Sequence, residues 1–314
     1  MNITVVLEQM IIILFLILTG VFLFRKKMIS EETSRQISGL IINVTNPALL
    51  ICSAFDDTPK VSLQELGLGA LVFLSAYIVL ILAAYLIPLL LRIPDHARYS
   101  YHMLTVFGNV GFIGIPLASA VLGSGALIFV SMSNLLYNVL IYTYGMSALR
   151  KTAVRQGTYH SEEHSESSVK KIINVGTISA LLTLIFYLAD FPVPTVISST
   201  LNYAGRATTL LSMLVLGVSV AQMAIRDIFS NPKLYLFVAI RQIVLPIVFT
   251  LVLSLFIKHP LILNTSALML AVPSGNMPLM LSKQLGIDEN TISQGIILST
   301  LLSLVTIPIV VWIL

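Results

Sequence analysis

Between Tyr99 and Leu149 the sequence runs for 51 residues without a single Asp, Glu, Lys or Arg. A helix crosses the hydrocarbon core of a bilayer in about 20 residues, so this run is too long for one crossing and fits two. Its Gly123-Ser124-Gly125 segment is typical of a turn between them. The whole chain is 57% hydrophobic and 10% charged, whereas a soluble globular domain has about 25% charged residues. The sequence therefore predicts an all-α membrane protein.

Ten apolar stretches are predicted to cross the membrane. Along the chain they are Met10–Phe24, Ile37–Phe55, Gly67–Leu91, two within Tyr99–Leu149, Ile172–Ala189, Ala207–Ile225, Leu234–Ile257, Pro260–Ser282 and Asn290–Leu314. The first has no basic residue before it and is followed by Arg25-Lys26-Lys27, which is the reverse of a secretory signal. We therefore expect a transmembrane helix there, with its N-terminus outside.

The basic residues are distributed unevenly between the two sides of this topology. With the N-terminus outside, 14 of the 18 Lys and Arg residues fall in inner loops, and only Lys60 and Lys258 fall in outer loops. Cytoplasmic loops of membrane proteins carry such an excess. The pattern predicts a multi-pass protein of the cell membrane with both termini outside. The basic pI is thus attributed to topology rather than to a nucleic-acid partner.

The longest polar stretch, residues 150–171, divides the chain into a first half at 1–149 and a second half at 172–314. It contains His160, His164 and three glutamates, but Ser161 stands where the metalloprotease helix pattern requires Glu. We expect a solvated cytoplasmic linker and no metal site. The sequence has neither a phosphate-binding loop nor a nucleophile-elbow motif. It therefore predicts a protein that is not an enzyme, is not driven directly by ATP and needs no cofactor.

Five predicted spans precede this linker and five follow it, so the second half lies upside down relative to the first. Such inverted-topology repeats are found in many secondary transporters. The fourth span of each half is interrupted, by Asn109–Pro116 (NVGFIGIP) in span four and by Val272–Pro278 (VPSGNMP) in span nine. We expect these two broken spans to cross each other.

Each interruption should unwind its helix within the membrane. Proline removes a backbone donor, and glycine destabilises a helix by about 1 kcal/mol relative to alanine. Unpaired backbone is tolerated at membrane depth only where protein or a water-filled cavity surrounds it. Ordinary proline kinks are the alternative, but matching positions in the two halves, each with an asparagine, favour a binding site.

The residue types at the interruptions indicate what the site would bind. Neither interruption contains Asp or Glu, which argues against a proton or sodium relay. Backbone N–H groups at a half-helix N-terminus, together with asparagine amides, could hold a carboxylate without a fixed cation. The candidate substrate-binding residues are Asn109, Asn276, Gly111, Gly114, Ser274, Gly275, Asn43 and Asn46, and the prolines expected to shape the breaks are Pro116, Pro273 and Pro278.

Four polar residues in the other spans each allow two interpretations. Asn43 and Asn46, in span two, could face the crossing or bond a neighbouring helix. Arg206, at the expected outer start of span seven, could assist an anion or snorkel to the headgroups. Arg241, about seven residues into span eight, could assist an anion or pair with lipid phosphate.

In its two interrupted segments and in Asn43–Pro47 (NVTNP), the sequence resembles the auxin efflux carrier family, which includes bacterial malate and malonate permeases and plant hormone carriers. The resemblance implies a fold like those of the bile-acid transporters and sodium/proton antiporters. Spans 1, 2, 6 and 7 would form a scaffold, and spans 3–5 and 8–10 a mobile transport unit. It also implies an organic anion bound beside the crossing, with Asn109 and Asn276 contributing. The sequence lacks the very long central loop of the plant carriers.

The leading functional hypothesis is a secondary carrier that moves a small carboxylate, such as malate, malonate or an auxin-like acid, by alternating access. A sodium- or proton-coupled carrier of the same fold is the alternative, and it would need a titratable centre. A receptor or an intramembrane enzyme would need a sensory domain or a catalytic pair, and neither is visible. The expected partners are the organic anion and the lipid bilayer, and a homodimer is a candidate assembly.

Overall fold

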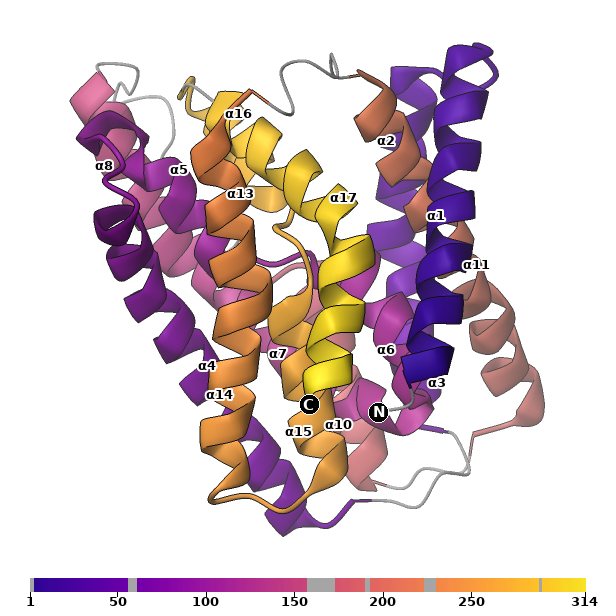
Figure 1. Ribbon diagram of the computed structural model, residues 1–314. Coiled ribbons are helices and arrows are strands. Elements are labelled where there is room, and N and C mark those ends of the chain that lie inside the picture. The colour runs from indigo at the N-terminus through magenta and orange to yellow at the C-terminus, as the bar shows by residue number, and fades with distance from the viewer. Residues whose placement is uncertain (1–2, 56–60, 157–172, 190–192, 223–229, 288–289) are drawn as a thin grey trace.

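The computed structural model describes residues 3–55, 61–156, 173–189, 193–222, 230–287 and 290–314. This part of the chain folds into a bundle of helices without strands (Figure 1). Seven of its helical segments are long and apolar enough to cross a membrane, and three shorter apolar helices accompany them: Val110–Leu122, Val175–Ala189 and Pro260–Ala271. The expectation of an all-helical, multi-pass membrane protein is confirmed at this level.

The helices follow one another along the chain as expected for two halves. The first half contains α1 (Ile3–Arg25), α2 (Glu31–Leu40), η1 (Ile41–Thr45), α3 (Asn46–Ser53), α4 (Leu63–Leu90), α5 (Asp95–Val106), η2 (Val110–Gly114), α6 (Ile115–Leu122), η3 (Ser124–Ala126), α7 (Leu127–Leu140), η4 (Ile141–Gly145) and α8 (Met146–Gln156). The second half contains α10 (Val175–Ala189), α11 (Thr195–Gln222), α13 (Pro232–Ala239), η5 (Ile240–Val244), α14 (Leu245–Ser254), α15 (Pro260–Ala271), α16 (Met277–Gln284) and α17 (Asn290–Ile313). Within these, η1, η2, η4 and η5 are π-helical turns.

Three of the π-helical turns, η1, η2 and η5, end two residues before a proline: Pro47, Pro116 and Pro246. Proline cannot donate to the carbonyl four residues earlier, and its ring crowds that carbonyl. The residue before the proline bonds instead to a carbonyl five residues back, as Ile115 N does to Val110 O. The wider turn inserts one residue into the helix, so these prolines help to decide which neighbouring side chains point inward.

Helices α1 and α11 pack with their backbones in contact. A Cβ on Gly217 would lie 2.2 Å from the carbonyl oxygen of Ile17, and a Cβ on Gly20 would lie 2.4 Å from that of Leu214. Only glycine permits so close an approach of two helices. Figure 1 shows the pair at one edge of the molecule, with α3 beside it.

Helix α11 begins at Thr195, twelve residues before the start predicted for span seven at Ala207. The prediction was wrong because the added segment is rich in Ser, Thr and Asn, which hydropathy does not assign to a membrane helix. Packing holds it in place, since a Cβ on Gly205 would come within 2.9 Å of the Cα of Leu49 in α3. Arg206 consequently lies inside the helix, where it is exposed, and not at its start.

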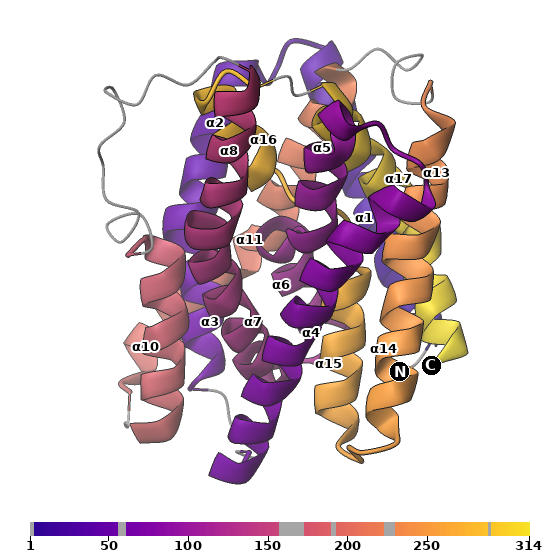
Figure 2. The ribbon, with the colours of Figure 1, turned by 90° about the vertical axis from the view of Figure 1, so that its left-hand side faces the viewer.

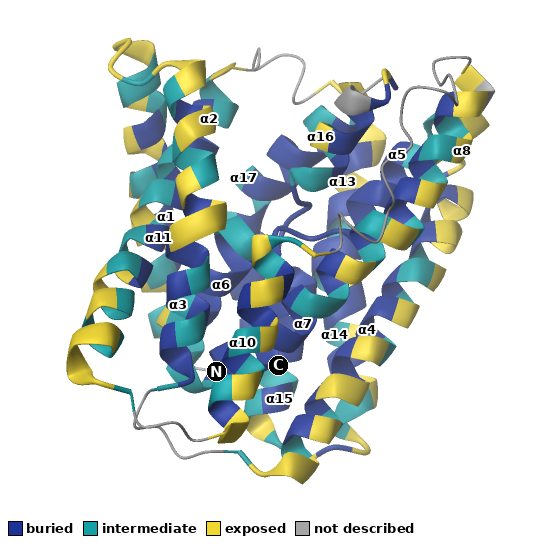
Figure 3. Cartoon of the chain, turned by 180° about the vertical axis from the view of Figure 1, so that it is seen from behind, coloured by how far each residue is buried: buried dark blue, intermediate teal, exposed yellow. Residues whose placement is uncertain are grey.

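Large apolar side chains are exposed on the outer faces of α1, α4 and α14; examples are Phe15, Phe22, Leu71, Leu82, Val248 and Val252. Figure 3 shows exposed residues on the outward sides of the helices and buried residues toward the middle of the bundle. Continuous apolar exposure of this kind suits contact with lipid and not with water.

The two termini lie toward the same end of the bundle, the end at which α14 and α15 are joined (Figures 1 and 2). The chain leaves α1 and α8 at the opposite end. Figure 2 also shows α4, α14 and α15 side by side, so that helices from both halves of the chain form one face.

Candidate functional site

The interruptions after α5 and α15 lie against each other. The backbone between α5 and η2 and the backbone between α15 and α16 form an isolated antiparallel bridge that pairs Gly108 with Ser274. Beside it, Asn109 N donates a hydrogen bond to Pro273 O at 2.7 Å. Each interruption thus supplies backbone partners to the other, which satisfies polar groups that lipid would leave unpaired.

Gly275 allows the two backbones to come this close. Its N–H donates to Phe107 O at 2.8 Å, and a Cβ at this position would lie 2.8 Å from the carbonyl oxygen of Gly108. In the first interruption, Gly111 and Gly114 are also tightly surrounded, because a Cβ on either would come within 3.3 Å of a neighbouring side chain. The glycines predicted for the site are therefore needed for packing.

Asn109 lies at the first interruption with half of its amide engaged. Its Oδ1 accepts a hydrogen bond from Phe112 N at 3.1 Å and so caps the N-terminus of η2. Its Nδ2 is buried and has no hydrogen-bond partner in the described part of the chain. A buried donor without a partner costs about 1–3 kcal/mol, and a bound carboxylate would supply the missing acceptor.

Asn46 reaches the same interruption from α3. Its Nδ2 donates to Gly111 O at 3.1 Å, while its Oδ1 and the neighbouring Thr45 Oγ1 are buried without partners among the described residues. Asn43 is exposed instead, and its Nδ2 donates to Gly39 O in its own helix. Of the two span-two asparagines that were predicted, the structure brings Asn46 to the interruption.

The second interruption offers one free amide and one engaged hydroxyl. Asn276 directly precedes α16, is half-buried, and makes no side-chain hydrogen bond within the described ranges. Ser274 is buried; its Oγ donates to Leu104 O at 2.8 Å and its N–H donates to Ser299 Oγ at 3.2 Å. Ser274 therefore joins the two interruptions, and Asn276 has the free donors.

The three predicted prolines lie where a helix has to start or stop. Pro116 and Pro278 are the second residues of α6 and α16, positions at which a helix does not need the backbone N–H. Pro273 lies in the non-helical segment and accepts the hydrogen bond from Asn109 N.

A buried arginine contacts both interrupted helices. Arg241, in η5, is 2% exposed; its Nε donates to Thr105 O at 2.7 Å, and its Nη1 donates to Leu270 O. The expectation of a site without a fixed cation is therefore wrong. The sequence shows Arg241 within a span but not the side it faces, and the π-helical turn of η5 directs it toward α5 and α15.

The chain matches the family described as "Membrane transport protein" over residues 5–311. It belongs to this family. An uncharacterized transporter of Methanocaldococcus jannaschii is 26% identical over 315 residues, which cover 98% of each chain. An uncharacterized transporter of Methanothermobacter thermautotrophicus is 22% identical over 304 residues, or 96% of each chain. The resemblance to auxin efflux carriers is thereby confirmed at the level of the family.

This transporter contains a buried polar network that sequence analysis missed. Gln242, next to Arg241, donates from Nε2 to Ser299 O at 3.0 Å and accepts at Oε1 from Thr306 Oγ1 at 2.9 Å. The network links η5 to α17, whose Ser299 also accepts from the second interruption. One signal was present in the sequence: Gln242 lies four residues before Pro246, a spacing that recurs at η1 and η2.

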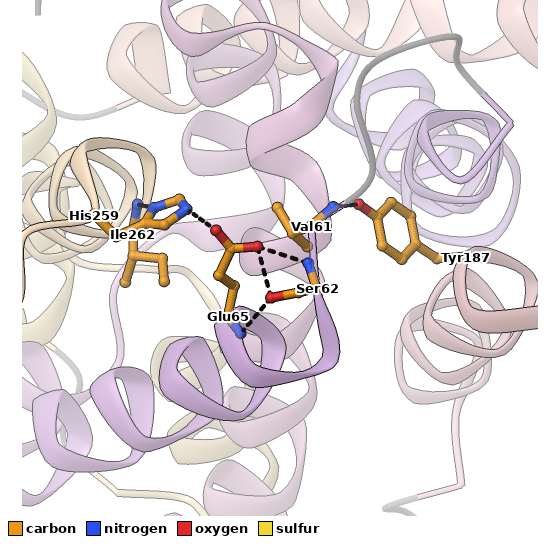
Figure 4. Close-up of polar contacts among 6 residues, drawn as sticks. All are labelled: Val61, Ser62, Glu65, Tyr187, His259 and Ile262. Atoms are coloured by element: carbon orange, nitrogen blue, oxygen red, sulfur yellow. Dashed lines mark hydrogen bonds and ion pairs between the residues drawn. The ribbon is translucent and has the colours of Figure 1, made fainter.

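A second polar cluster of the transporter lies where α4 and α15 begin (Figure 4). Ser62 and Glu65 form a capping box at the start of α4, and Glu65 Oε1 lies 3.1 Å from His259 Nε2, at the start of α15. The Tyr187 hydroxyl of α10 accepts a hydrogen bond from Val61 N at 2.5 Å. The cluster therefore connects the start of α4 to α15 on one side and to α10 on the other.

Proposed function

We propose that this transporter is a secondary carrier that moves a small organic anion, a carboxylate of the malate or malonate kind, across the cell membrane by alternating access. In this proposal ten spans form a 5+5 inverted repeat, residues 1–149 and 172–314 joined by the linker at 150–171. The broken spans four (α5, η2 and α6) and nine (α15 and α16) cross near the bilayer midplane. The observation that carries the proposal is the buried, unpartnered Nδ2 of Asn109 beside the Gly108–Ser274 bridge.

The geometry supports a carboxylate as the ligand. Helical backbone resumes after each interruption, at η2 and at α16, so both interruptions direct a positive helix end toward their meeting point. Asn109 and Asn276 directly precede these two helices. Their free N–H groups would donate to the two oxygens of one carboxylate, or to the two carboxylates of a dicarboxylate.

The packing supports a division into a scaffold (α1–α3, α10 and α11) and a transport unit made of the other helices. Glycines bring α1 and α11 into backbone contact, which suits a part that does not deform. The two interruptions are joined to each other by backbone bonds, which suits a part that moves as one body. Asn46 extends from the scaffold to the first interruption, where it would contact the substrate or the backbone that holds it.

The cation-coupled alternative would need a buried titratable acid in the spans. Among the described residues, no Asp or Glu side chain is buried. We therefore favour a carrier driven by the gradient of the anion itself.

The experiment that tests the proposal is counterflow of radiolabelled mono- and dicarboxylates in proteoliposomes that contain the purified protein. We expect flux of at least one small carboxylate. Asn109→Ala and Asn276→Ala should each raise the KM by about tenfold, because each removes a hydrogen bond to a charged group worth about 1.5–3 kcal/mol. Asn202→Ala, a half-buried asparagine of α11, is the matched control and should leave KM unchanged. Unchanged transport in both site variants, or no carboxylate flux at all, would reject the proposal.

We also infer from the distribution of basic residues that both termini face outside. Fusing a reporter that is active only in the external compartment to the C-terminus tests this orientation. A reporter that stays silent there, but is active when it is fused after α8, would reverse the proposed topology.

A further inference from the structure

Arg241 is positioned to compensate charge at the two interrupted helices. Its guanidinium hydrogen-bonds the carbonyl of Thr105 in the last turn of α5 and the carbonyl of Leu270 in the last turn of α15. The negative ends of both half-helices therefore share one buried cation. Each helix C-terminus carries about half a negative charge, so two ends together balance one guanidinium.

No acidic side chain neutralises this cation within the described ranges. Arg241 is buried, yet the described ion pairs all involve other residues, and its hydrogen-bond acceptors are backbone carbonyls. The two positive helix ends, at η2 and α16, contribute about half a charge each and have no counter-charge of their own. The four helix ends and the arginine therefore leave about one net positive charge where the interruptions meet.

The third nitrogen of the guanidinium faces the meeting point. Nη2 has no hydrogen-bond partner among the described residues and lies 3.3 Å from where a Cβ on Gly108 would be. It borders a small cavity that is also lined by Tyr77, Ser133 and Ser266. The positive charge thus reaches the Gly108–Ser274 bridge directly.

The fit is specific to arginine. A guanidinium presents five N–H donors in a rigid plane, so it can bond two carbonyls from different helices and still offer a third edge. A lysine in the same place would present one ammonium to a single carbonyl at a time. Pro246, which follows η5, supports the π-helical turn that directs the arginine inward.

We propose that Arg241 is the resident counter-charge of the site: it holds the two half-helix ends together and makes the site select anions without a co-bound cation such as Na⁺. The inference rests on the proposed function, since it assigns the charge selectivity of the same site. Arg241 is a positioning residue, because it acts through the helix ends and the local charge. Its role predicts that the carrier needs no sodium.

The test uses full-length protein in proteoliposomes and compares wild type with Arg241→Lys, Arg241→Gln and Arg241→Ala. The matched control is Arg206→Gln, an exposed arginine on α11. Carboxylate counterflow is measured in sodium medium and in choline medium. We expect equal wild-type flux in both media, a KM raised about tenfold or more in Arg241→Lys and Arg241→Gln, and no change in the control; each tenfold corresponds to 1.4 kcal/mol.

The Arg241→Ala variant separates charge from packing. Guanidinium and urea have nearly the same shape, but only guanidinium carries a charge. Low concentrations of guanidinium should restore part of the flux of Arg241→Ala, and urea at the same concentration should not. A merely structural role would not distinguish the two.

Three results would overturn the inference while leaving the proposed function in place: a sodium requirement in the wild type, an unchanged KM in Arg241→Gln, or equal rescue by guanidinium and urea. The sodium comparison uses the wild type alone, so it decides even if the variants fail to fold. Wild-type protein that moves no carboxylate in either medium would overturn the proposed function, and this inference with it.

Discussion

Replacing Gly275 with alanine is the sharpest test of how the two interrupted helices meet. The backbone of Gly275 does not have a positive φ, so alanine is allowed there by conformation and any effect is steric. The added Cβ would lie 2.8 Å from the Gly108 carbonyl oxygen and 3.1 Å from its carbonyl carbon, both of which are backbone atoms. Ordinary contact begins near 3.4 Å, so the two segments would have to separate by about 0.6 Å.

That separation would weaken the bonds that join the interruptions. Gly275 N to Phe107 O measures 2.8 Å and Asn109 N to Pro273 O measures 2.7 Å, so both would approach the limit of a useful hydrogen bond. Overpacking costs typically 1–3 kcal/mol and each weakened bond adds up to about 1 kcal/mol, so we expect a destabilisation of about 2–4 kcal/mol. Because Asn109 and Asn276 flank the strained segments, transport should fall with stability.

The assay pairs carboxylate counterflow with thermal denaturation of the detergent-solubilised protein. Gly67→Ala in α4 is the matched control, since a Cβ there would meet nothing within 4 Å and alanine favours a helix. We expect a lowered denaturation temperature and strongly reduced flux for Gly275→Ala, and neither change for Gly67→Ala. Wild-type flux and stability in Gly275→Ala would show that the two interruptions do not touch as described.

Three further predictions concern other parts of the molecule. Gly217→Ala should destabilise the protein by about 2 kcal/mol or more, because its Cβ would lie 2.2 Å from Ile17 O; thermal denaturation measures this, and an unchanged midpoint would contradict the backbone contact of α1 and α11. Glu65→Gln should cost no more than about 1 kcal/mol of stability, since the pair with His259 is partly solvated; a larger loss in the same assay would show that the cluster does more than join two helix starts. Pro246→Ala should let η5 return toward α-helical bonding and raise KM as the Arg241 variants do, and kinetics like those of the wild type would show that the proline is dispensable.

Much of the fold could be predicted from the sequence because its signals are local. Apolar runs identify helices in lipid, and Gly and Pro within Asn109–Pro116 and Val272–Pro278 mark where those helices stop. The start of α11 was missed, because its polar first turns are held by contact with α3, which no local pattern records.

The candidate site was less predictable because it depends on rotation about helix axes. Asn43 and Asn46 lie three residues apart and would face one side of a regular helix, yet in η1 the first is exposed and the second is buried. Arg241 could be read as facing lipid or protein until η5 fixed its direction. Its acceptors are backbone carbonyls, which every residue has, so the sequence contained no sign of them.

The hydrogen bonds between the two halves of the chain also bear on how the protein is made. The Thr105 carbonyl finds its partner 136 residues later in the chain, and the Leu104 carbonyl finds its partner 170 residues later. Since the chain is synthesised from its N-terminus, the first broken helix enters the membrane well before the residues that complete it exist. During that interval its open backbone has to be shielded by water or by the insertion machinery. Newly made first halves should therefore be prime substrates for membrane quality control until the later spans arrive.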